Sequence, residues 1–496
     1  MIQEAIHTDL FRLIAPECLT VVTALIILAV SFGRKTTQSS SGPLYGVIGM
    51  IGLALAFVMS LFYQSTGFSL GSAFIVTDAT RWVKAGLLLM GFLIFWQHTA
   101  SPSHIGNQGE FHALMLFAIA GMSLLIGADH LLMIFVALEI TALSLYILAA
   151  IDKTNTLATR VALKYFLIGG LSAAFVLYGF SLIFGVAGTM SLSGIAEHCQ
   201  TNGNDPLLMM GILMALVGFG FKVAAAPFHW WVADVYTSTL TPVTCLIAST
   251  SKVAGFFVMG RFLWHGLIGA QGSLDGWEWT QGWIPWIAML AVLSMLVGNL
   301  AALRQTKLRR LIGFSAVAHT GYALLGLCSP TPQASASIAF YMLTYGLSVI
   351  GLLSLLELTQ GNQKDAEHRQ LEGLWRRAPW LAACLMLLVL SLAGIPPLVG
   401  FIAKFNLFIA ALNTPHQTLG LIGLVVLALG ASAVSLYYYL GVLKAAFCLD
   451  QPDEAMELKP STSQYGLVFT CTLLTLLFGV FPGWLLTRFL EAFSGA

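Results

Sequence analysis

Ionisable side chains stand well inside the long apolar segments of this sequence. The five most deeply placed are Glu139, Lys222, Lys252, His319 and Lys404, and Lys164 stands nearer to a segment end. One Lys or Glu at the centre of a membrane helix costs about 2.5–3.5 kcal/mol. Four lysines and one glutamate would together cost on the order of 10 kcal/mol, as much as the stability of a whole domain. Residues of this cost persist where they face one another or an internal water path, so the pattern indicates charge transfer through a membrane.

Lysine has the chemistry for carrying a proton across such a barrier. Burial favours the neutral amine by roughly 4–7 kcal/mol, and a carboxylate about 4 Å away returns roughly 4 kcal/mol at an effective dielectric near 20. Because the two effects are similar in size, a buried lysine gains or loses its proton as a neighbouring charge approaches or leaves. Arginine stays charged and could not serve. We therefore predict that these residues form a proton relay.

Two apolar segments are too long for a simple crossing. Residues 207–235 and 379–412 would extend roughly 43 Å and 51 Å as continuous helices, against a hydrocarbon core of about 30 Å. The first contains Pro227 and the second contains Pro396 and Pro397. Proline interrupts the helical hydrogen-bond ladder, and the freed backbone groups need water or side chains as partners. The sequence therefore predicts two broken helices, each near a buried lysine.

Each candidate residue also has a purely structural interpretation. Glu139 could form a permanent buried ion pair with Lys222 or Lys252. His319 could be a hydrogen-bonded packing residue. Lys164 could extend its ammonium to the membrane surface, and Lys404 could bind carbonyls freed by the double proline. His229 and Asp234 follow the first break, where they could line a cytoplasmic proton entry or simply be solvated. The stretch "SLYYYLG" is interpreted as packing or interface aromatics.

Composition defines the fold class. The 496 residues are 58% hydrophobic and 9% charged, with a mean hydropathy of +0.85, and apolar runs of about 18 or more residues recur along the chain. The formal charge of +1 gives no reason to expect nucleic-acid binding. We predict an all-α polytopic membrane protein with about 14 transmembrane helices. The expected spans are 11–32, 44–63, 76–97, 110–127, 129–151, 160–185, 207–235, 240–265, 284–302, 310–328, 334–357, 379–412, 420–447 and 464–489.

The positive charges of the loops predict the orientation. Fourteen lysines and arginines fall in one set of alternating loops and five in the other, while the remaining four lie within spans. Cytoplasmic loops are enriched in these residues, so both termini are predicted to be periplasmic. The N-terminal stretch lacks a basic region, so its apolar run is expected to be a retained span.

Local signatures of redox or nucleotide chemistry are missing from the sequence. The seven cysteines are far apart, with no CxxC spacing for a metal or an iron–sulfur cluster. There is no Walker A loop, no GxGxxG after a strand and no HExxH. We therefore expect no cofactor or metal on this chain, with the energy source elsewhere.

Several segments together resemble one protein family. They are "ADHLLMIFVALEITALSLYILAA", "ALKYFLIGGLSAAFVLYGFSLIFG", "GFGFKVAAAPFHWWVADVY", "LRRLIGFSAVAHTGYALLGL" and "LSLAGIPPLVGFIAKFNLF". They closely resemble the antiporter-like subunit N of bacterial proton-pumping NADH–quinone oxidoreductase, or respiratory complex I. The resemblance extends from about Glu110 to Lys444, and the combination of motifs is far more specific than any one of them.

The resemblance implies a fold of two inverted five-helix repeats with broken helices 7 and 12. It divides the chain into an N-terminal three-helix segment at 1–109, repeats at 110–266 and 284–447, and a C-terminal helix at 464–496. In the family, a glutamate on helix 5 pairs with a lysine on helix 6, which matches Glu139 and Lys164. Lysines on helices 7, 8 and 12 and a histidine on helix 10 match Lys222, Lys252, Lys404 and His319. Lysine at the last position resembles subunit N, because the sister subunit M has glutamate there.

The resemblance also implies a setting. The complex would use FMN, iron–sulfur clusters and quinone on other chains of a bacterial inner membrane, and the neighbours would include subunit M and the small subunit K.

One loop departs from the family pattern, with Ala233 in place of proline and Thr237 to Leu240 in place of an acidic, glycine-containing turn. Three alternatives remain: an Mrp-type cation/proton antiporter subunit, a stand-alone solute carrier, and a scaffold that does not pump.

Overall fold

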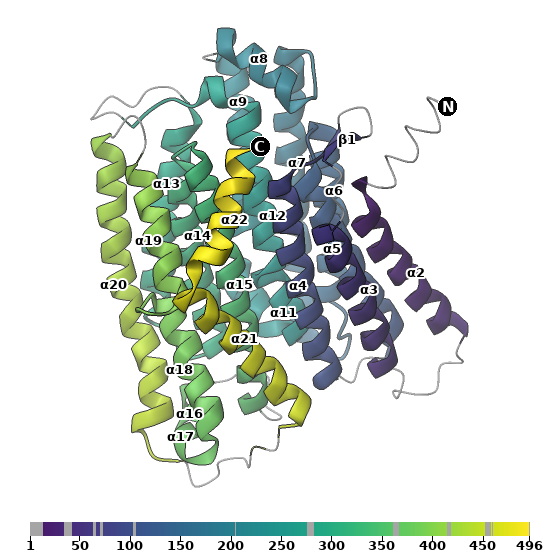
Figure 1. Cartoon of the computed structure of the whole chain (residues 1–496), viewed down its shortest axis with the longest axis vertical. Helices are drawn as coiled ribbons and strands as arrows, with labels where there is room; N and C mark the ends of the chain where they lie inside the picture. Colours follow the sequence, from purple (N-terminus) through teal and green to yellow (C-terminus); the bar gives the residue numbers. More distant parts are fainter. Residues whose placement is uncertain are drawn as a thin grey trace.

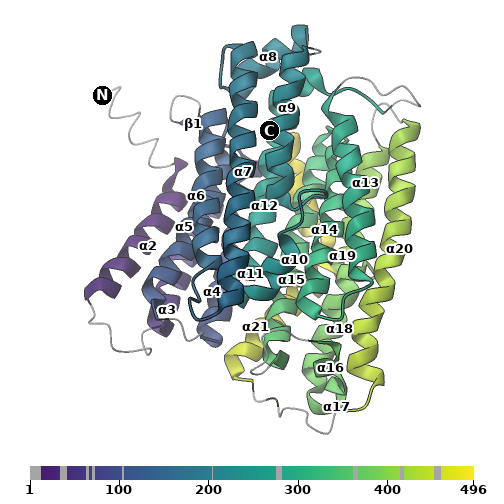
Figure 2. The same ribbon diagram turned by 180° about the vertical axis from the view of Figure 1, so that it is seen from behind.

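The computed structural model describes residues 13–33, 42–62, 66–69, 73–102, 106–203, 205–274, 282–360, 367–413, 418–451, 458 and 460–495. They form a bundle of long helices that run mostly in one direction or its reverse (Figures 1 and 2). Within these ranges, twelve helices are long and apolar enough to cross a membrane. The expected all-helical polytopic fold is thus confirmed, whereas the count of fourteen spans and the inverted repeats stay predictions.

The N-terminal helices are α2 (Ala15–Gly33), α3 (Gly42–Phe62) and α4 (Asp78–Ala100). A short antiparallel hairpin that the sequence did not predict, β1 (Gly67–Ser69) and β2 (Phe74–Val76), precedes α4. Thr77 and Thr80 exchange side-chain hydrogen bonds with each other's backbone N–H groups at the start of α4. This capping box satisfies donors that the first helical turn leaves unpaired, so α4 begins directly after the hairpin.

The first broken helix lies in the middle part of the chain. Its elements are α5 (Gln108–Gly127), α6 (Leu131–Ala149), α7 (Thr156–Ala187), α8 (Leu192–Asn202), α9 (Pro206–Val223), α10 (Val232–Ser238), α11 (Thr241–Ala248), α12 (Thr250–Arg261), η2 (Phe262–Gly266) and η3 (Ile268–Ala270). α9 stops at Val223, and Ala224 takes a left-handed conformation with φ 66°. A cis peptide joins Ala226 to Pro227, and helix resumes only at α10. The expected span 240–265 is also interrupted, because Ser249 is non-helical between α11 and α12.

The second broken helix lies near the C-terminal end. The elements here are α13 (Trp283–Ala302), α14 (Leu308–Leu327), α15 (Pro332–Gln360), α16 (His368–Leu371), α17 (Leu374–Arg377), α18 (Pro379–Ala393), α19 (Val399–Leu412), α20 (Leu419–Cys448), α21 (Thr462–Val480) and α22 (Pro482–Ser494). α18 ends at Ala393 and is followed by Gly394 with φ 86°, and α19 starts after the cis Pro396–Pro397 bond.

The predicted single C-terminal helix at 464–496 is wrong. The chain leaves the helix at Phe481, and α22 starts again at Pro482. Proline has no N–H to donate and its fixed φ suits a first helical position, so Pro482 ends one helix and begins the next.

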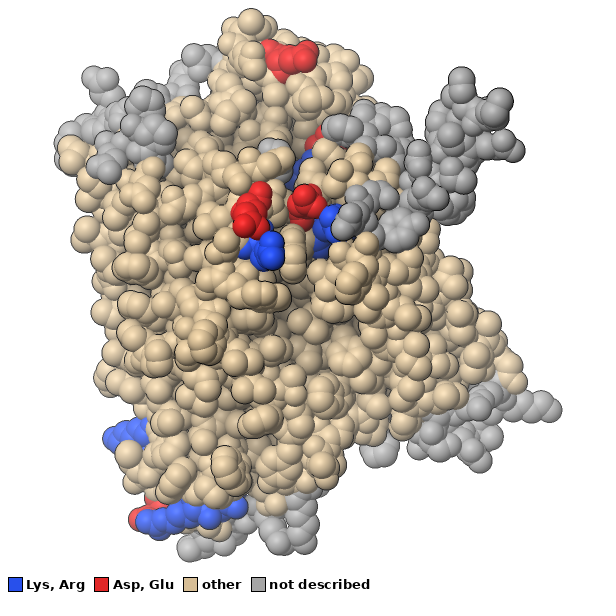
Figure 3. Space-filling view, in the orientation of Figure 1, with Lys and Arg blue, Asp and Glu red and all other residues tan. Residues whose placement is uncertain are grey.

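α15 is the central helix of the bundle, with its apolar part fully buried (Figure 1). It packs against α12, α14, α18, α19 and α21. By contrast, α7 and α20 expose many apolar side chains, as a membrane or a partner subunit requires. The face in Figure 3 carries few charged side chains: an acidic patch at its top, a mixed group in its upper half and others at its lower end.

Candidate functional site

Lys222 lies in the last turn of α9, directly before the first break. It is half-buried and makes no hydrogen bond or ion pair with any described residue. Glu139 on α6 is also half-buried, and the two side chains are close enough to interact electrostatically. No ion pair within 4.0 Å joins them in the described part of the chain. The Lys222 side chain is therefore held by no hydrogen bond or ion pair from the described residues and lies near the Glu139 carboxylate.

Lys164 does not pair with Glu139, which corrects the pairing that the resemblance implied. Its Nζ lies 2.7 Å from Asp234 Oδ2 and donates to the Trp230 carbonyl at 3.2 Å. Arg310 Nη1 lies 3.6 Å from the other oxygen of Asp234. The reason is the break in the helix, because α10 starts anew beside α7 and brings Asp234 towards Lys164.

Lys252 on α12 is 2% exposed and donates two hydrogen bonds to α14. Its Nζ donates to the Ala316 carbonyl at 2.5 Å and to Thr320 Oγ1 at 2.9 Å. The Thr320 hydroxyl in turn donates to the Val223 carbonyl at 2.7 Å. Since Val223 is the last residue of α9, its carbonyl is one that the helix leaves unpaired. Thr320 thus connects the end of the Lys222 helix to Lys252.

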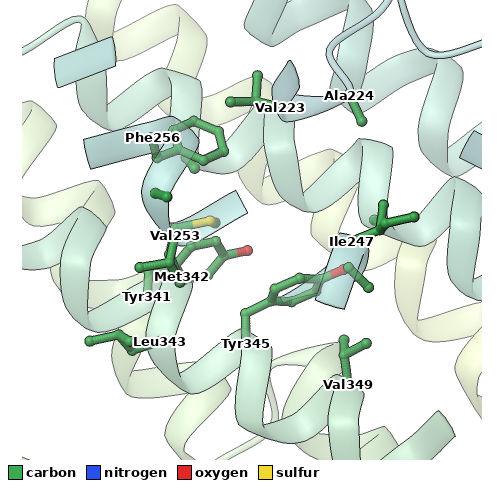
Figure 4. Close-up of a cluster of buried hydrophobic side chains, with 14 of the residues drawn as sticks. Val223, Ala224, Ile247, Val253, Phe256, Tyr341, Met342, Leu343, Tyr345 and Val349 are labelled. Carbon is green, nitrogen blue, oxygen red and sulfur yellow. The ribbon is translucent and has the colours of Figure 1, made fainter. Parts of the chain in front are cut away.

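His319 on α14 lies between two tyrosines. Its Nδ1 is 2.7 Å from the Tyr341 hydroxyl of α15, and its Nε2 is 3.3 Å from the Tyr439 hydroxyl of α20. Tyr439 also hydrogen-bonds to Ser315. Tyr438 and Tyr439 of "SLYYYLG" pack in the core and Tyr437 is exposed, as the packing or interface interpretation expected, and Tyr439 in addition contacts His319. Figure 4 shows Tyr341 and Tyr345 of α15 among apolar side chains such as Val253 and Phe256.

Lys404 on α19 donates hydrogen bonds to backbone carbonyls at the second helix break. Its Nζ donates to the Leu392 and Ala393 carbonyls at 3.3 Å and 3.0 Å, and to Ser432 Oγ of α20 at 3.0 Å. The two carbonyls belong to the last turn of α18, so Lys404 satisfies backbone groups that the break frees. The capping interpretation of Lys404 therefore describes its contacts, and it is compatible with proton transfer because an ammonium can release a proton to water.

A small internal cavity of about 10 Å³ separates His319 from Lys404, and both residues line it. Tyr341, Ser348 and Ser391 add hydroxyl groups to its wall. Such a volume holds about one water molecule, and the wall offers several hydrogen-bonding partners for it. Both Lys252 and Lys404 also act electrostatically on His319. The three residues thus form one connected group in which a charge on one member disfavours a charge on another.

The remaining predicted residues lie at the breaks. His229 is half-buried against Trp230 and Phe314, with its Nδ1 buried and without a partner among the described residues. Pro227, Pro396 and Pro397 are exposed. His229 and Asp234 thus lie on the same short stretch after the first break, where Asp234 pairs with Lys164 and His229 packs against Phe314 of α14.

Sequence reasoning missed several partners. Thr320 stands next to His319 in the chain, but Tyr341, Tyr439 and Ser432 are supplied by helices distant in sequence and carry no local signal. One lysine and one arginine that were counted among the loop charges for the orientation are in fact buried. Lys84 pairs with Glu17 at 2.7 Å, and Arg261 pairs with Asp129 at 2.6 Å. In the described ranges, no group of three or more His, Cys, Asp or Glu side chains is placed to hold a metal ion.

The fold and the site define a polytopic membrane protein with a buried set of ionisable and hydroxyl side chains between two broken helices. Comparisons with known proteins agree with this class. A family model described as NADH:quinone oxidoreductase/Mrp antiporter, transmembrane, matches residues 128–430. The NADH-quinone oxidoreductase subunit N 2 of Acidobacterium capsulatum is 40% identical over 495 residues, covering 98% of this chain and 99% of the relative. Subunit N of Methylovorus glucosotrophus is 32% identical over 482 residues, 96% of each chain.

Solved structures show the same fold. A chain of respiratory complex I from Thermus thermophilus with bound aureothin superposes with a TM-score of 0.79 at 32% identity, covering 95% of this chain and 98% of that one. A chain of the Mrp complex from Dietzia sp. superposes with a TM-score of 0.83 at 19% identity, covering 98% and 97%. The chain therefore belongs to the NADH:quinone oxidoreductase/Mrp antiporter family, among the relatives named NADH-quinone oxidoreductase subunit N.

Proposed function

We propose that this chain is a proton-translocating membrane subunit of a bacterial NADH–quinone oxidoreductase. The observation that carries the proposal is the connected group formed by Lys252, Thr320, His319 and Lys404 between the two helix breaks. Each member can bind or pass a proton, and each lies in the buried interior of the bundle. An apolar packing core has no use for such a costly set of polar groups.

The proposed route starts at Lys222 beside the first break. A proton leaves Lys222 through water at the open backbone of residues 224–231 and reaches the Thr320 hydroxyl and Lys252. It continues to His319, whose two ring nitrogens face different hydroxyls, so the ring can accept on one side and donate on the other. One water in the small cavity then passes the proton to Lys404, from which it leaves along the break between α18 and α19.

Glu139 is the proposed receiver of the driving signal. It lies on the face of α6 that exposes Val136, Ile140 and Leu143, where a neighbouring subunit can bind. A charge or conformational change in that neighbour would alter the field of Glu139 at Lys222 and shift the proton affinity of the lysine. Moving one proton against 100 mV costs about 2.3 kcal/mol. At an effective dielectric near 20, a charge about 4 Å away supplies roughly 4 kcal/mol and one about 8 Å away roughly 2 kcal/mol, so coupling across more than 4 Å is of the same order as this cost.

The redox chemistry is proposed to belong to other chains. FMN, the iron–sulfur clusters and the quinone site would lie in other subunits, with subunit M and the small subunit K as membrane neighbours. The complex would stand in the bacterial inner membrane with both ends of this chain on the periplasmic side. The positions of α2 and α22 support an even number of crossings, because the described chain starts and ends on the same side of the bundle (Figure 1).

An Mrp-type cation/proton antiporter subunit is the second candidate. It is supported by the description of the matching family model, which names both groups, and by the similarity in fold to the Dietzia complex. A stand-alone carrier is less well supported, because the cavity between His319 and Lys404 is only about 10 Å³ and is too small for a solute.

Gentle solubilisation with an affinity tag on this chain separates the two candidates. Co-purification of flavin and iron–sulfur absorbance, with inhibitor-sensitive quinone reduction by NADH, is the expected result. An intact but colourless assembly of membrane subunits that exchanges Na⁺ for H⁺ would contradict the proposal and support the antiporter.

A further inference from the structure

A cavity lined mainly by apolar side chains lies away from the proposed relay. Its volume is about 270 Å³, and none of the six proposed relay residues lines it. The cavity is enclosed by side chains from α4, α12, α15 and α22. Phe256, Phe257, Ile338, Met342 and Phe493 form most of its apolar wall. This composition suits a hydrocarbon chain and offers nothing to a hydrated ion.

One end of the cavity is polar and carries unused hydrogen-bond donors. Arg261, which is 9% exposed, lines this end together with Asp129 and His265. Asp129 Oδ1 accepts one bond from Arg261 Nη2 at 2.6 Å. The Nε and Nη1 groups of the same guanidinium are buried without a partner among the described residues. A native protein rarely leaves buried donors unsatisfied, so an acceptor from outside the chain is expected there.

The polar end lies near one membrane surface. Arg261 ends α12, and Thr77 and Thr80 at the start of α4 also line the cavity. Ion pairs lie close in sequence to lining residues, since Arg81, next to Thr80, pairs with Asp78 at 2.7 Å, and Glu491, two residues before Phe493, pairs with Arg488 at 3.2 Å. Figure 3 shows such a mixed group of charges in the upper half of this face. Polar and apolar groups thus follow the order of a membrane lipid, from headgroup to chain.

We infer that this cavity binds one phospholipid, with an acyl chain between α12, α15 and α22 and an ester or phosphate oxygen that accepts hydrogen bonds from Arg261. Asp129 already balances the charge of the guanidinium, so the ligand needs an acceptor oxygen more than a full negative charge. Phospholipid supplies both the oxygen and the chain, and it is present at high concentration in the surrounding bilayer.

Photo-cross-linking in the purified complex tests the inference. The probe is a phosphatidylethanolamine with a diazirine in one acyl chain, and peptide mass spectrometry locates the attachment. We expect labelling of the segment that contains Phe256, Phe257 and Trp264. Ala339→Phe should fill the cavity from α15 and reduce this labelling at least fivefold. The matched control Ala433→Phe, on the exposed face of α20, should leave it unchanged.

Two further results would overturn the inference. The first is equal labelling of this segment in Ala339→Phe and the original protein, which would mean that the probe reacts from the outer surface. The second is competition: if an excess of an isoprenoid quinone removes the label and an excess of unlabelled phosphatidylethanolamine does not, the cavity is a quinone site.

Arg261→Lys keeps the positive charge beside Asp129 but removes the spare donors, and we expect it to reduce labelling about threefold or more. Quinone reduction by the same preparations shows that each variant is assembled.

Discussion

At the scale of single residues, the sequence singled out the ionisable side chains proposed as the relay but did not predict what they contact. Lys222, Lys252 and Lys404 are recognisable because a charge inside an apolar run is costly wherever the run folds. Their partners depend on tertiary structure. Lys164 contacts Asp234 because α10 starts again after the break, and His319 meets Tyr439, which lies 120 residues further along the chain. No local pattern contains such information.

Thr320 is the residue that links the Lys222 helix to Lys252, and this link can be tested. Thr320→Val keeps the shape but removes the hydroxyl, leaving the Val223 carbonyl without its partner at a cost of about 1–3 kcal/mol. We expect proton pumping by the reconstituted complex to fall roughly tenfold, about 1.4 kcal/mol in barrier, while quinone reduction falls less. Thr470→Val is the control, since that hydroxyl bonds only to its own helix. Pumping at the original rate in Thr320→Val would show that the link is not on the route.

The pairing of Lys164 can be measured by a double-mutant cycle. The Lys164 and Asp234 side chains are 42% and 28% exposed, and pairs near solvent are worth about 0.2–1 kcal/mol. A cycle with Lys164→Met and Asp234→Asn should give a coupling energy in this range from thermal unfolding. The parallel cycle with Glu139→Gln should give a value near zero. A larger coupling to Glu139 than to Asp234 would contradict the observed contacts.

At the scale of elements, length and proline content predicted the two broken helices, because a membrane limits how far a straight helix can run. The same reasoning failed at Pro482, since residues 464–489 were short enough to be accepted as one crossing. The β1–β2 hairpin was missed because three-residue strands carry too little periodicity to detect. Length arguments therefore detect breaks only in segments that exceed the membrane.

Glycine sets how closely α19 approaches the end of α18. A Cβ at Gly400 would lie 1.7 Å from the Ser391 carbonyl oxygen, which is backbone and cannot move away cheaply. Gly400→Ala should therefore displace α19 and the bonds of Lys404 to α18. We expect a lower melting temperature of the complex, by several degrees, and strongly reduced pumping. Gly430→Ala on α20, where a Cβ meets nothing within 4 Å, should change neither. Equal stability of the two variants would show that the α18–α19 contact is looser than described.

A buried ion pair ties the N-terminal helices together. Glu17 of α2 accepts from Lys84 of α4 and from Ser123 of α5, at 2.7 Å each. Lys84→Met would leave Glu17 as an unpaired buried charge and should destabilise the protein by about 3–5 kcal/mol. Adding Glu17→Gln should restore most of that loss. Thermal unfolding of the single and double variants checks this, and a double variant as unstable as the single one would contradict it.

At the scale of the whole molecule, the fold turns a nearly neutral, apolar chain into a membrane element with a polar interior. The formal charge is only +1, and two of the proposed relay lysines, Lys252 and Lys404, are buried, beside α14 and beside the break between α18 and α19. Exposed apolar faces on α6, α7 and α20 suit lipid and neighbouring subunits, which is consistent with a chain that works inside a larger assembly. The fold supplies the two breaks, and the sequence places a lysine at each of them.

The number of protons pumped per electron pair in a Lys252→Met complex is the most direct test of the central claim. The complex would be reconstituted into liposomes with NADH and quinone, and Lys444→Met would serve as the control because Lys444 is an exposed lysine of α20. The relay predicts that Lys252→Met loses proton pumping at least tenfold, while assembly and cofactor content stay unchanged. It predicts an unaltered ratio for Lys444→Met. A Lys252→Met complex that assembles and pumps at the original ratio would contradict the account.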